Sequence, residues 1–316
     1  LEEELLLQYS KEQARREAPS GTSIASTGGV EGRANLEETG WGVIFAQQID
    51  AATRDALRVL LYHRNEGAGA LYREYTYKGD PPETAQQFLA RHEAGTGLVE
   101  PQKMPYYLLL VGDPESIPFE FQYELDLQYS VGRIWFEKPE EYAAYAQSVV
   151  TTETEGVDLG RRAAFFAPVH RDDRATQMAV EAVVQPMLER LQRTQWEQQW
   201  ELEWCIEECA TKAQLGKLLG GADTPALLVT FGHGVEWAAD DPRRAESQGA
   251  VVCQDFSRVS GLSAEHYFAA GDIQDNARLL GLVAFLAVGS SAGIGARDDF
   301  AQMRSARDHL YGQPLL

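Results

Sequence analysis

The chain has 316 residues, of which 44% are hydrophobic and 24% are charged, as in soluble globular proteins. Its 48 Asp and Glu residues against 28 Lys and Arg residues give a formal net charge of −20. Such a charge repels phosphate backbones and anionic headgroups, so nucleic-acid and membrane partners are not expected. No run approaches about 18 uninterrupted apolar residues, and the acidic, leucine-rich start is unlike a signal peptide.

Cysteine usage favours a reducing cytoplasm, because three cysteines in a large chain do not resemble a disulfide framework. Cys205 and Cys209 have the spacing of half a metal site, yet no second Cys or His pair follows at ligand spacing. The pair Asp298 and Asp299 lies in no EF-hand loop and is better placed to begin a helix. We therefore expect a cytoplasmic protein that needs no metal and no cofactor.

The distribution of apolar runs divides the chain into three parts. Residues 1–35 indicate an N-terminal helix followed by a Gly- and Ser-rich linker. Residues 36–155 and 156–316 each alternate short apolar strands with helices, which predicts two α/β subdomains in tandem with mostly parallel sheets. The expected strands are 43–46, 106–111, 163–167, 202–206, 226–231, 249–253 and 282–288, with amphipathic helices at 51–63 and 174–193.

Two of these strands deliver polar residues to the edge where parallel α/β sheets gather their functional groups. One ends in Gly232-His233-Gly234, whose glycines expose the imidazole as a general base requires, although a structural histidine fits equally well. The strand 106–111 is followed by Glu115 and Asp126, which could line a pocket for a guanidinium or simply belong to a solvated acidic loop.

The last strand, 282–288, continues into Gly289-Ser290-Ser291-Ala292-Gly293, which by itself matches the nucleophile elbow of a serine hydrolase. In that fold an acid and then a histidine follow the serine along the chain. Here the only histidine after Ser291 is His309, near the end. A serine hydrolase is therefore a minor alternative.

Together these segments resemble the gingipain-like and caspase-like cysteine peptidases of clan CD, in particular bacterial cytoplasmic members. The resemblance spans roughly Trp41 to Phe300 and implies a caspase-like, mostly parallel sheet flanked by helices. Its pieces are YYLLLVGDPE at 106–115, IPFEFQY at 117–123, Asp126, VGR at 131–133, FGHG at 231–234, DPRR at 241–244, QGA at 248–250, AG at 292–293 and DDF at 298–300.

In these peptidases a histidine and a cysteine at the ends of neighbouring strands form a catalytic dyad. The resemblance implies that His233 is the base and that Gly234 supplies a backbone oxyanion donor. It places Asp126 at the base of the pocket for the residue before the cleaved bond, which implies cleavage after arginine or, second, lysine. Asp113 and Glu115 are both candidates to orient His233, and we favour Glu115.

The nucleophile position departs from the family, because Gly289 stands where the resemblance expects the cysteine. None of the three cysteines follows that strand, and a hydroxyl at Ser290 or Ser291 would be a far poorer nucleophile. Three explanations stay open: a peptidase whose nucleophile has been replaced, a natural pseudoprotease that keeps the pocket for binding, or a sequence that is inaccurate at this loop.

The resemblance thus leads us to expect a caspase-like cysteine endopeptidase that cleaves proteins after arginine or lysine, here in a form without its nucleophile. Its partners would be protein or peptide substrates, together with an upstream regulator that activates it. The alternative is a pseudoprotease that acts as a peptide-binding or scaffold module and recognises a basic segment without cutting it.

Overall fold

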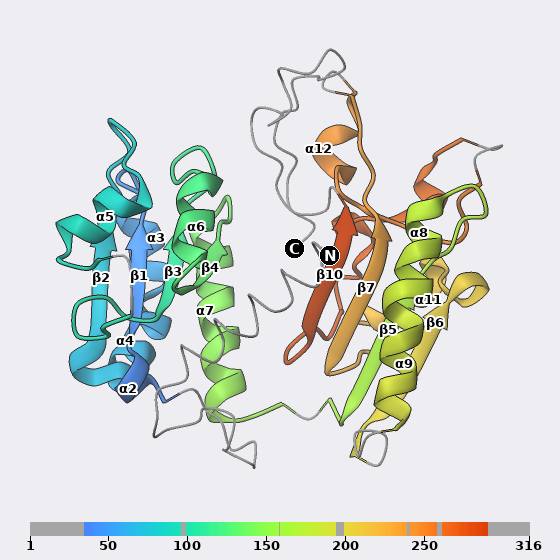
Figure 1. Cartoon of the computed structure of the whole chain (residues 1–316), viewed down its shortest axis with the longest axis horizontal. Coiled ribbons are helices and arrows are strands. Elements are labelled where there is room, and N and C mark those ends of the chain that lie inside the picture. Colours follow the sequence, from blue (N-terminus) through green and yellow to red (C-terminus); the bar gives the residue numbers. More distant parts are fainter. Residues whose placement is uncertain are drawn as a thin grey trace, which may run out of the picture.

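A computed structural model describes residues 35–95, 99–157, 159–193, 199–238, 241–257 and 261–289 of the chain. It has two four-stranded parallel sheets flanked by helices (Figure 1), which confirms the predicted α/β class. The helix and linker predicted within residues 1–35 lie outside the described residues, apart from Asn35. In the described part of the chain, no helix combines the length and the apolar character that crossing a membrane requires.

The first sheet has the strand order β2-β1-β3-β4, and all neighbouring strands are parallel. Its strands are β1 (Trp41–Phe45), β2 (Tyr72–Thr76), β3 (Tyr107–Val111) and β4 (Ser130–Ile134). The helices around it are α2 (Leu36–Thr39), α3 (Ala51–Ala56), α4 (Arg58–Ala68), the 3-10 turn η2 (Gly69–Leu71), α5 (Ala85–Arg91), α6 (Phe119–Asp126) and α7 (Pro139–Thr154).

Helices cover both faces of this first sheet. On one face, α4 and α7 pack on the sheet in a core that includes Val43, Leu60 and Tyr142. On the other face, α5 and α6 pack in a core that includes Phe88 and Phe121. Alternate residues of the central strands β1 and β3 point into the two cores, which is why these strands are apolar along their length.

The second sheet has the strand order β10-β7-β5-β6 and is also parallel. Its strands are β5 (Arg162–Ala167), β6 (Glu201–Ile206), β7 (Leu227–His233) and β10 (Val283–Gly289). The helical segments around it are α8 (Arg174–Ala179), the π-helical η3 (Val180–Val184), α9 (Gln185–Gln192), α11 (Lys212–Leu218), α12 (Arg244–Ser247) and the 3-10 turns η4 (Glu207–Cys209), η5 (Ala264–His266) and η6 (Ala270–Asp272).

The strand predicted at 249–253 differs from the structure. Only β8 (Val251–Val252) forms there, and it pairs antiparallel with β9 (Tyr267–Phe268) outside both parallel sheets. The segment is apolar because it is buried in the core beside α11 and β10, and Cys253 at its end is fully buried. An apolar run of this length therefore marks burial, and not membership of the main sheet.

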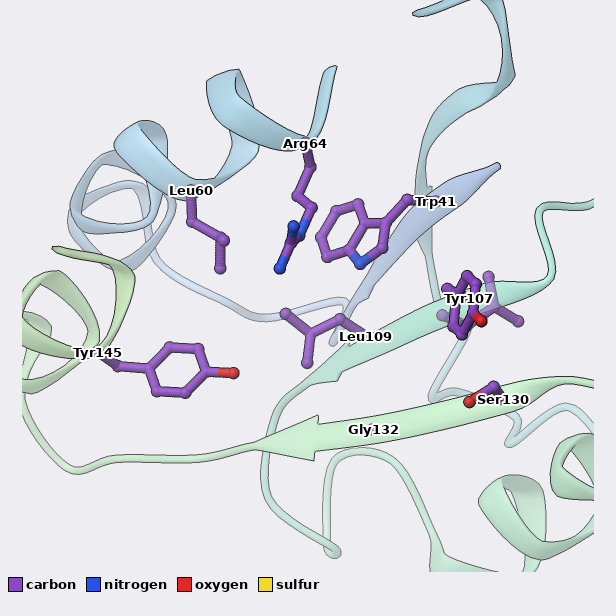
Figure 2. A pocket seen from close by; sticks show the side chains of 9 residues that line it. Trp41, Leu60, Arg64, Tyr107, Leu109, Ser130, Gly132 and Tyr145 are labelled. Carbon is purple, nitrogen blue, oxygen red and sulfur yellow. The ribbon is translucent and has the colours of Figure 1, made fainter. Parts of the chain in front are cut away.

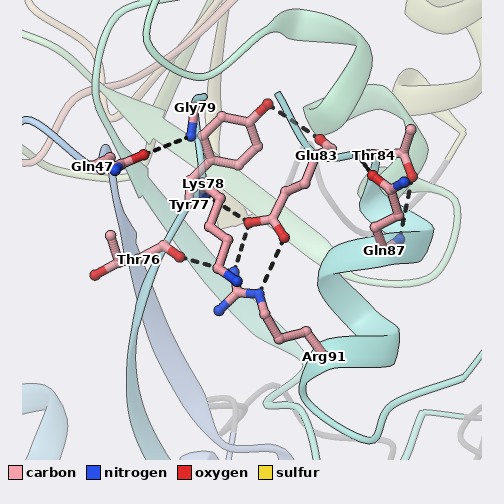
Figure 3. Close-up of polar contacts among 9 residues, drawn as sticks. All are labelled: Gln47, Thr76, Tyr77, Lys78, Gly79, Glu83, Thr84, Gln87 and Arg91. Atoms are coloured by element: carbon pink, nitrogen blue, oxygen red, sulfur yellow. Dashed lines mark hydrogen bonds and ion pairs between the residues drawn. The ribbon is translucent and has the colours of Figure 1, made fainter. Parts of the chain in front are cut away.

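Polar contacts hold the loop between β2 and α5 at the carboxyl edge of the first sheet (Figure 3). The carboxylate of Glu83, whose side chain is 8% exposed, pairs with Arg91 at 2.6 Å and accepts the backbone N–H of Lys78 at 2.7 Å. The backbone N–H of Gly79 donates to the side-chain oxygen of Gln47 at 3.0 Å. These contacts tie the loop to α5 and to the segment after β1.

Candidate active site

The carboxyl ends of β7 and β10 lie side by side in the second sheet (Figure 1). Their register pairs His233, the last residue of β7, with Gly289, the last residue of β10. Parallel neighbours end at the same edge of a sheet, so the two positions meet although they are far apart in the sequence. The structure thus brings together two of the predicted site residues.

Asp173 holds the imidazole of His233 from the side of its Nε2 atom. The distance from His233 Nε2 to Asp173 Oδ2 is 2.6 Å. Asp173 is also the N-cap of α8, where its Oδ1 accepts the backbone N–H groups of Ala175 at 2.9 Å and Thr176 at 3.4 Å. These hydrogen bonds at the start of α8 therefore hold the carboxylate in the position from which it contacts the histidine.

The surroundings of Asp173 keep its carboxylate ionised. Burial by itself raises the pKa of this carboxyl, but the backbone N–H of Ala175 and the His233 imidazole together hold the pKa below its ordinary value. An ionised carboxylate only accepts hydrogen bonds, so the contact requires a hydrogen on His233 Nε2. In the neutral imidazole, Nδ1 is then the nitrogen that can accept a proton.

Gly289 leaves an open position in front of that nitrogen. A Cβ atom added at Gly289 would lie 3.9 Å from His233 Nδ1, its one neighbour within 4 Å among the described residues. Gly289 is exposed, so a larger side chain has room there. A side chain at position 289 would therefore project beside the nitrogen that can accept a proton.

The backbone N–H of Gly234, the expected oxyanion donor, already has a hydrogen-bond acceptor within the protein. Its backbone N–H donates to the carbonyl oxygen of Gly289 at 2.6 Å. A Cβ atom at Gly234 would lie 2.5 Å from that oxygen and 3.1 Å from the oxygen of Gly249, so only glycine fits at this position. The Gly234 amide could stabilise an oxyanion only after the Gly289 carbonyl had turned away.

Glu115 does not contact the histidine. It is exposed in the turn after β3, where the Asp113 carboxylate accepts the backbone N–H groups of Glu115 at 2.8 Å and Ser116 at 2.7 Å. That turn belongs to the first sheet, whereas His233 ends a strand of the second. Among the described residues Asp173 is the carboxylate that contacts His233, and no contact supports the predicted role of Glu115 as the orienting residue.

Asp126 also belongs to the part of the chain that surrounds the first sheet. It is the last residue of α6, and its carboxylate accepts the backbone N–H of Val131 at 3.3 Å, at the amino end of β4. His233, in contrast, stands at the carboxyl edge of the second sheet, and no contact of the described residues joins the two. Burial raises the pKa of the Asp126 carboxyl. Within the described ranges no Lys or Arg pairs with Asp126, so its carboxylate can accept a cationic group.

The three cysteines do not supply a replacement nucleophile. Cys253 is buried, and burial raises the pKa of its thiol to about 12. Burial and the neighbouring Cys209 raise the pKa of the Cys205 thiol, and Cys209 itself is exposed in η4. Buried thiols with a raised pKa are poor nucleophiles at neutral pH. Ser290 and Ser291 lie outside the described residues.

Metal ligands do not gather in the described part of the chain, where no group of three His, Cys, Asp or Glu side chains could hold an ion. Asp298 and Asp299 lie outside that part. His233, with Asp173 as its partner, is a group that could carry out acid–base chemistry at the end of β7.

Sequence reasoning missed Asp173, although a signal was present. Asp173 follows the predicted strand 163–167 and directly precedes a predicted helix, which is the N-cap position where Asp is preferred. The rule that functional groups follow strand ends applied to this strand as well. What the sequence lacked was the strand order, since only the order β10-β7-β5 makes β5 the neighbour of the histidine strand.

Comparison with models of protein families, with curated proteins and with solved structures finds no match for the chain. A functional assignment therefore depends on the geometry at the ends of β5, β7 and β10 and on the sequence resemblance.

Proposed function

We propose that the chain is a caspase-like cysteine endopeptidase that cleaves proteins after arginine or lysine, in a form without its nucleophile, because Gly289 occupies that position. One observation supports this most directly: a Cβ atom added at position 289 would lie 3.9 Å from His233 Nδ1, while Asp173 contacts the opposite nitrogen. A nucleophile, a base and a group that orients the base in that order form the arrangement that activates weak nucleophiles.

A thiol at position 289 would make this arrangement reactive. His233 Nδ1 takes the thiol proton, and the thiolate attacks the scissile carbonyl. The imidazolium, stabilised by Asp173, then protonates the leaving amine, and water hydrolyses the acyl-enzyme with His233 again as base. With Gly289 no side-chain atom can form the acyl bond, so a bound substrate stays intact.

The substrate class in this proposal is a protein segment containing arginine or, second, lysine. The resemblance supports this class, because it places Asp126 in the pocket for that side chain. The carboxylate of Asp126 also forms no ion pair with a Lys or Arg among the described residues. The net charge of −20 also favours the approach of basic segments. A cytoplasmic setting and activation by an upstream regulator belong to the same proposal and rest on the resemblance and on cysteine usage.

A peptide-library digest read by mass spectrometry tests the proposal. Four proteins are compared: the unchanged chain, Gly289→Cys, and two double variants that add His233→Ala or Asp126→Ala to Gly289→Cys. We expect cleavage after arginine in Gly289→Cys alone, no cleavage in the unchanged chain, and loss of cleavage with either second substitution. Cleavage that survives His233→Ala would exclude the dyad, and cleavage that keeps its arginine preference in Asp126→Ala would exclude the specificity role.

A peptide-binding module is the second candidate. The bond from the Gly234 N–H to the Gly289 carbonyl favours it, because that bond occupies the amide an endopeptidase needs for the oxyanion. A module of this kind would bind arginine peptides, measured by fluorescence anisotropy, and lose them in Asp126→Ala. It would show no turnover in Gly289→Cys, with or without candidate activators.

A further inference from the structure

An arginine of the chain itself lies in a guanidinium site close in sequence to His233. Arg243 places its Cζ atom 3.6 Å above the ring centroid of Trp237. Its Nε–H donates to Asp241 Oδ1 at 3.0 Å and its Nη2–H donates to Oδ2 at 2.7 Å, so both carboxylate oxygens are used. A planar cation that stacks on an indole and pairs with both oxygens of a carboxylate is held as proteins hold a ligand's arginine.

The aromatic face of this site is fixed by side chains other than that of Arg243. The indole Nε1–H of Trp237 donates to the Ser247 hydroxyl at 2.9 Å, and its backbone N–H donates to the Gln248 side chain at 2.9 Å. Ser247 and Gln248 are both buried. The indole therefore does not need the Arg243 side chain to keep its position.

Arg243 differs from an arginine that joins two elements of the fold. Arg64 lies beside Trp41 (Figure 2), where its side chain is 16% exposed and its Cζ atom is 5.9 Å from the ring centroid. Its two terminal nitrogens donate to Glu153 at 2.7 Å each, which ties α4 to α7. The Arg243 side chain, in contrast, is 52% exposed and bonds a carboxylate only two residues away. Its departure would separate no elements of the fold.

The site lies near the edge of the second sheet where β7 ends. Trp237 follows His233 by four residues, so their Cα atoms are at most about 14 Å apart. Between them, the backbone N–H of Val235 donates to the Ala250 carbonyl at 2.8 Å, and the Val235 carbonyl accepts the N–H of Gly249 at 2.8 Å. An extended peptide covers this distance with about four residues.

We infer that Trp237 and Asp241 form a second arginine site of the peptide-binding surface, which Arg243 fills until an arginine of a bound segment replaces it. The inference rests on the proposed function and narrows its substrate class to segments with two basic residues. One of them belongs to Asp126, as the resemblance implies, and the other to this site. Arginine is preferred over lysine here, because an ammonium group lacks the planar fork that both stacks and pairs.

Heteronuclear NMR of the full chain tests the site through the indole N–H signal of Trp237, which is identified by its loss in Trp237→Phe. The probe is N-acetylarginine amide, and N-acetyllysine amide is the control of equal charge. In Arg243→Ala we expect the arginine probe to shift the signal saturably, with a dissociation constant on the order of 1–10 mM, and the lysine probe to bind at least about 5-fold more weakly. In the unchanged chain the arginine probe should also bind at least about 5-fold more weakly, because the tethered Arg243 competes with it.

Charge-matched variants separate this site from general attraction to an acidic protein. Adding Asp241→Asn to Arg243→Ala should abolish the shift, whereas adding Glu246→Gln, the same change of charge at an exposed residue of α12, should preserve it. Arg244→Ala removes the same charge as Arg243→Ala and should not open the site.

Four results would each overturn the inference: equal binding in the unchanged chain and in Arg243→Ala, equal binding of the two probes, binding that survives Asp241→Asn, or no saturable shift up to about 50 mM. None of these results depends on cleavage. Failure of the site is therefore distinct from failure of the proposed peptidase, which the digest with Gly289→Cys reports.

Discussion

Gly289 and His233 occupy paired positions at the ends of adjacent parallel strands, and a Cβ atom at Gly289 would lie 3.9 Å from His233 Nδ1. The other imidazole nitrogen contacts Asp173, which comes from the loop after β5. Three neighbouring strands thus contribute one residue each at the same edge of the sheet. In the proposed peptidase site, the nucleophile is the side chain that position 289 lacks.

The two glycines at this edge should respond differently to alanine. Gly234→Ala places a Cβ 2.5 Å from the Gly289 oxygen, so we expect a loss of about 1–3 kcal/mol in the free energy of unfolding. Gly289→Ala has its nearest neighbour at 3.9 Å and should change the free energy by less than about 0.5 kcal/mol. Urea denaturation followed by circular dichroism measures both, and equal losses would show that the packing at Gly234 is not as described.

Asp173→Asn tests the contribution of the carboxylate charge, because Asn keeps the N-cap of α8. The pKa of Asp173 is below its ordinary value in the folded protein. The charge therefore stabilises the fold above the unfolded pKa of about 3.9, and this contribution is lost as the pH falls through the folded pKa.

We expect Asp173→Asn to lower the melting temperature by about 1–3 °C at pH 7 and to leave it unchanged at about pH 2. The expected change is small because the His233 side chain is 43% exposed, so that solvent screens its interaction with Asp173. Differential scanning calorimetry at the two pH values provides the measurement. A difference in melting temperature between the two proteins that grows as the pH falls would contradict a stabilising charge on Asp173.

The native thiols should differ sharply in reactivity. Cys209 is exposed, whereas Cys205 and Cys253 are buried and the pKa of the Cys253 thiol is raised to about 12. At pH 8 iodoacetamide should alkylate Cys209 within minutes and leave the other two intact in the folded protein. Mass spectrometry of tryptic peptides identifies the modified thiols. Labelling of Cys253 as fast as Cys209 would contradict the described core.

The sequence predicts the strands with an apolar or alternating run well and misses the two edge strands of the first sheet. Strands β1, β3, β5 and β7 lie inside their sheets, and β6 and β10 are the edge strands of the second sheet. Each of these six strands was expected within a few residues of its position. Strands β2 and β4 lie at the edges of the first sheet and carry polar or small residues such as Glu74 and Gly132, so no apolar run marks them.

Site residues were predictable when they depended on strand ends and unpredictable when they depended on strand order. His233 and Gly289 each follow an apolar run, so the sequence placed both at a functional edge. Glu115 also follows such a run, but its strand belongs to the first sheet. Only the three-dimensional order of the second sheet shows that Asp173 is the carboxylate next to the histidine.

The pKa of the thiol introduced by Gly289→Cys tests the central claim most directly. Its alkylation rate by iodoacetamide is followed against pH in a Cys209→Ser background, with and without His233→Ala. We predict a thiol pKa below about 7.5 when His233 is present, because the imidazolium stabilises the thiolate, and a value near 8.5 when it is removed. The same pKa of about 8.5 in both proteins would show that position 289 and His233 do not form a nucleophile–base pair.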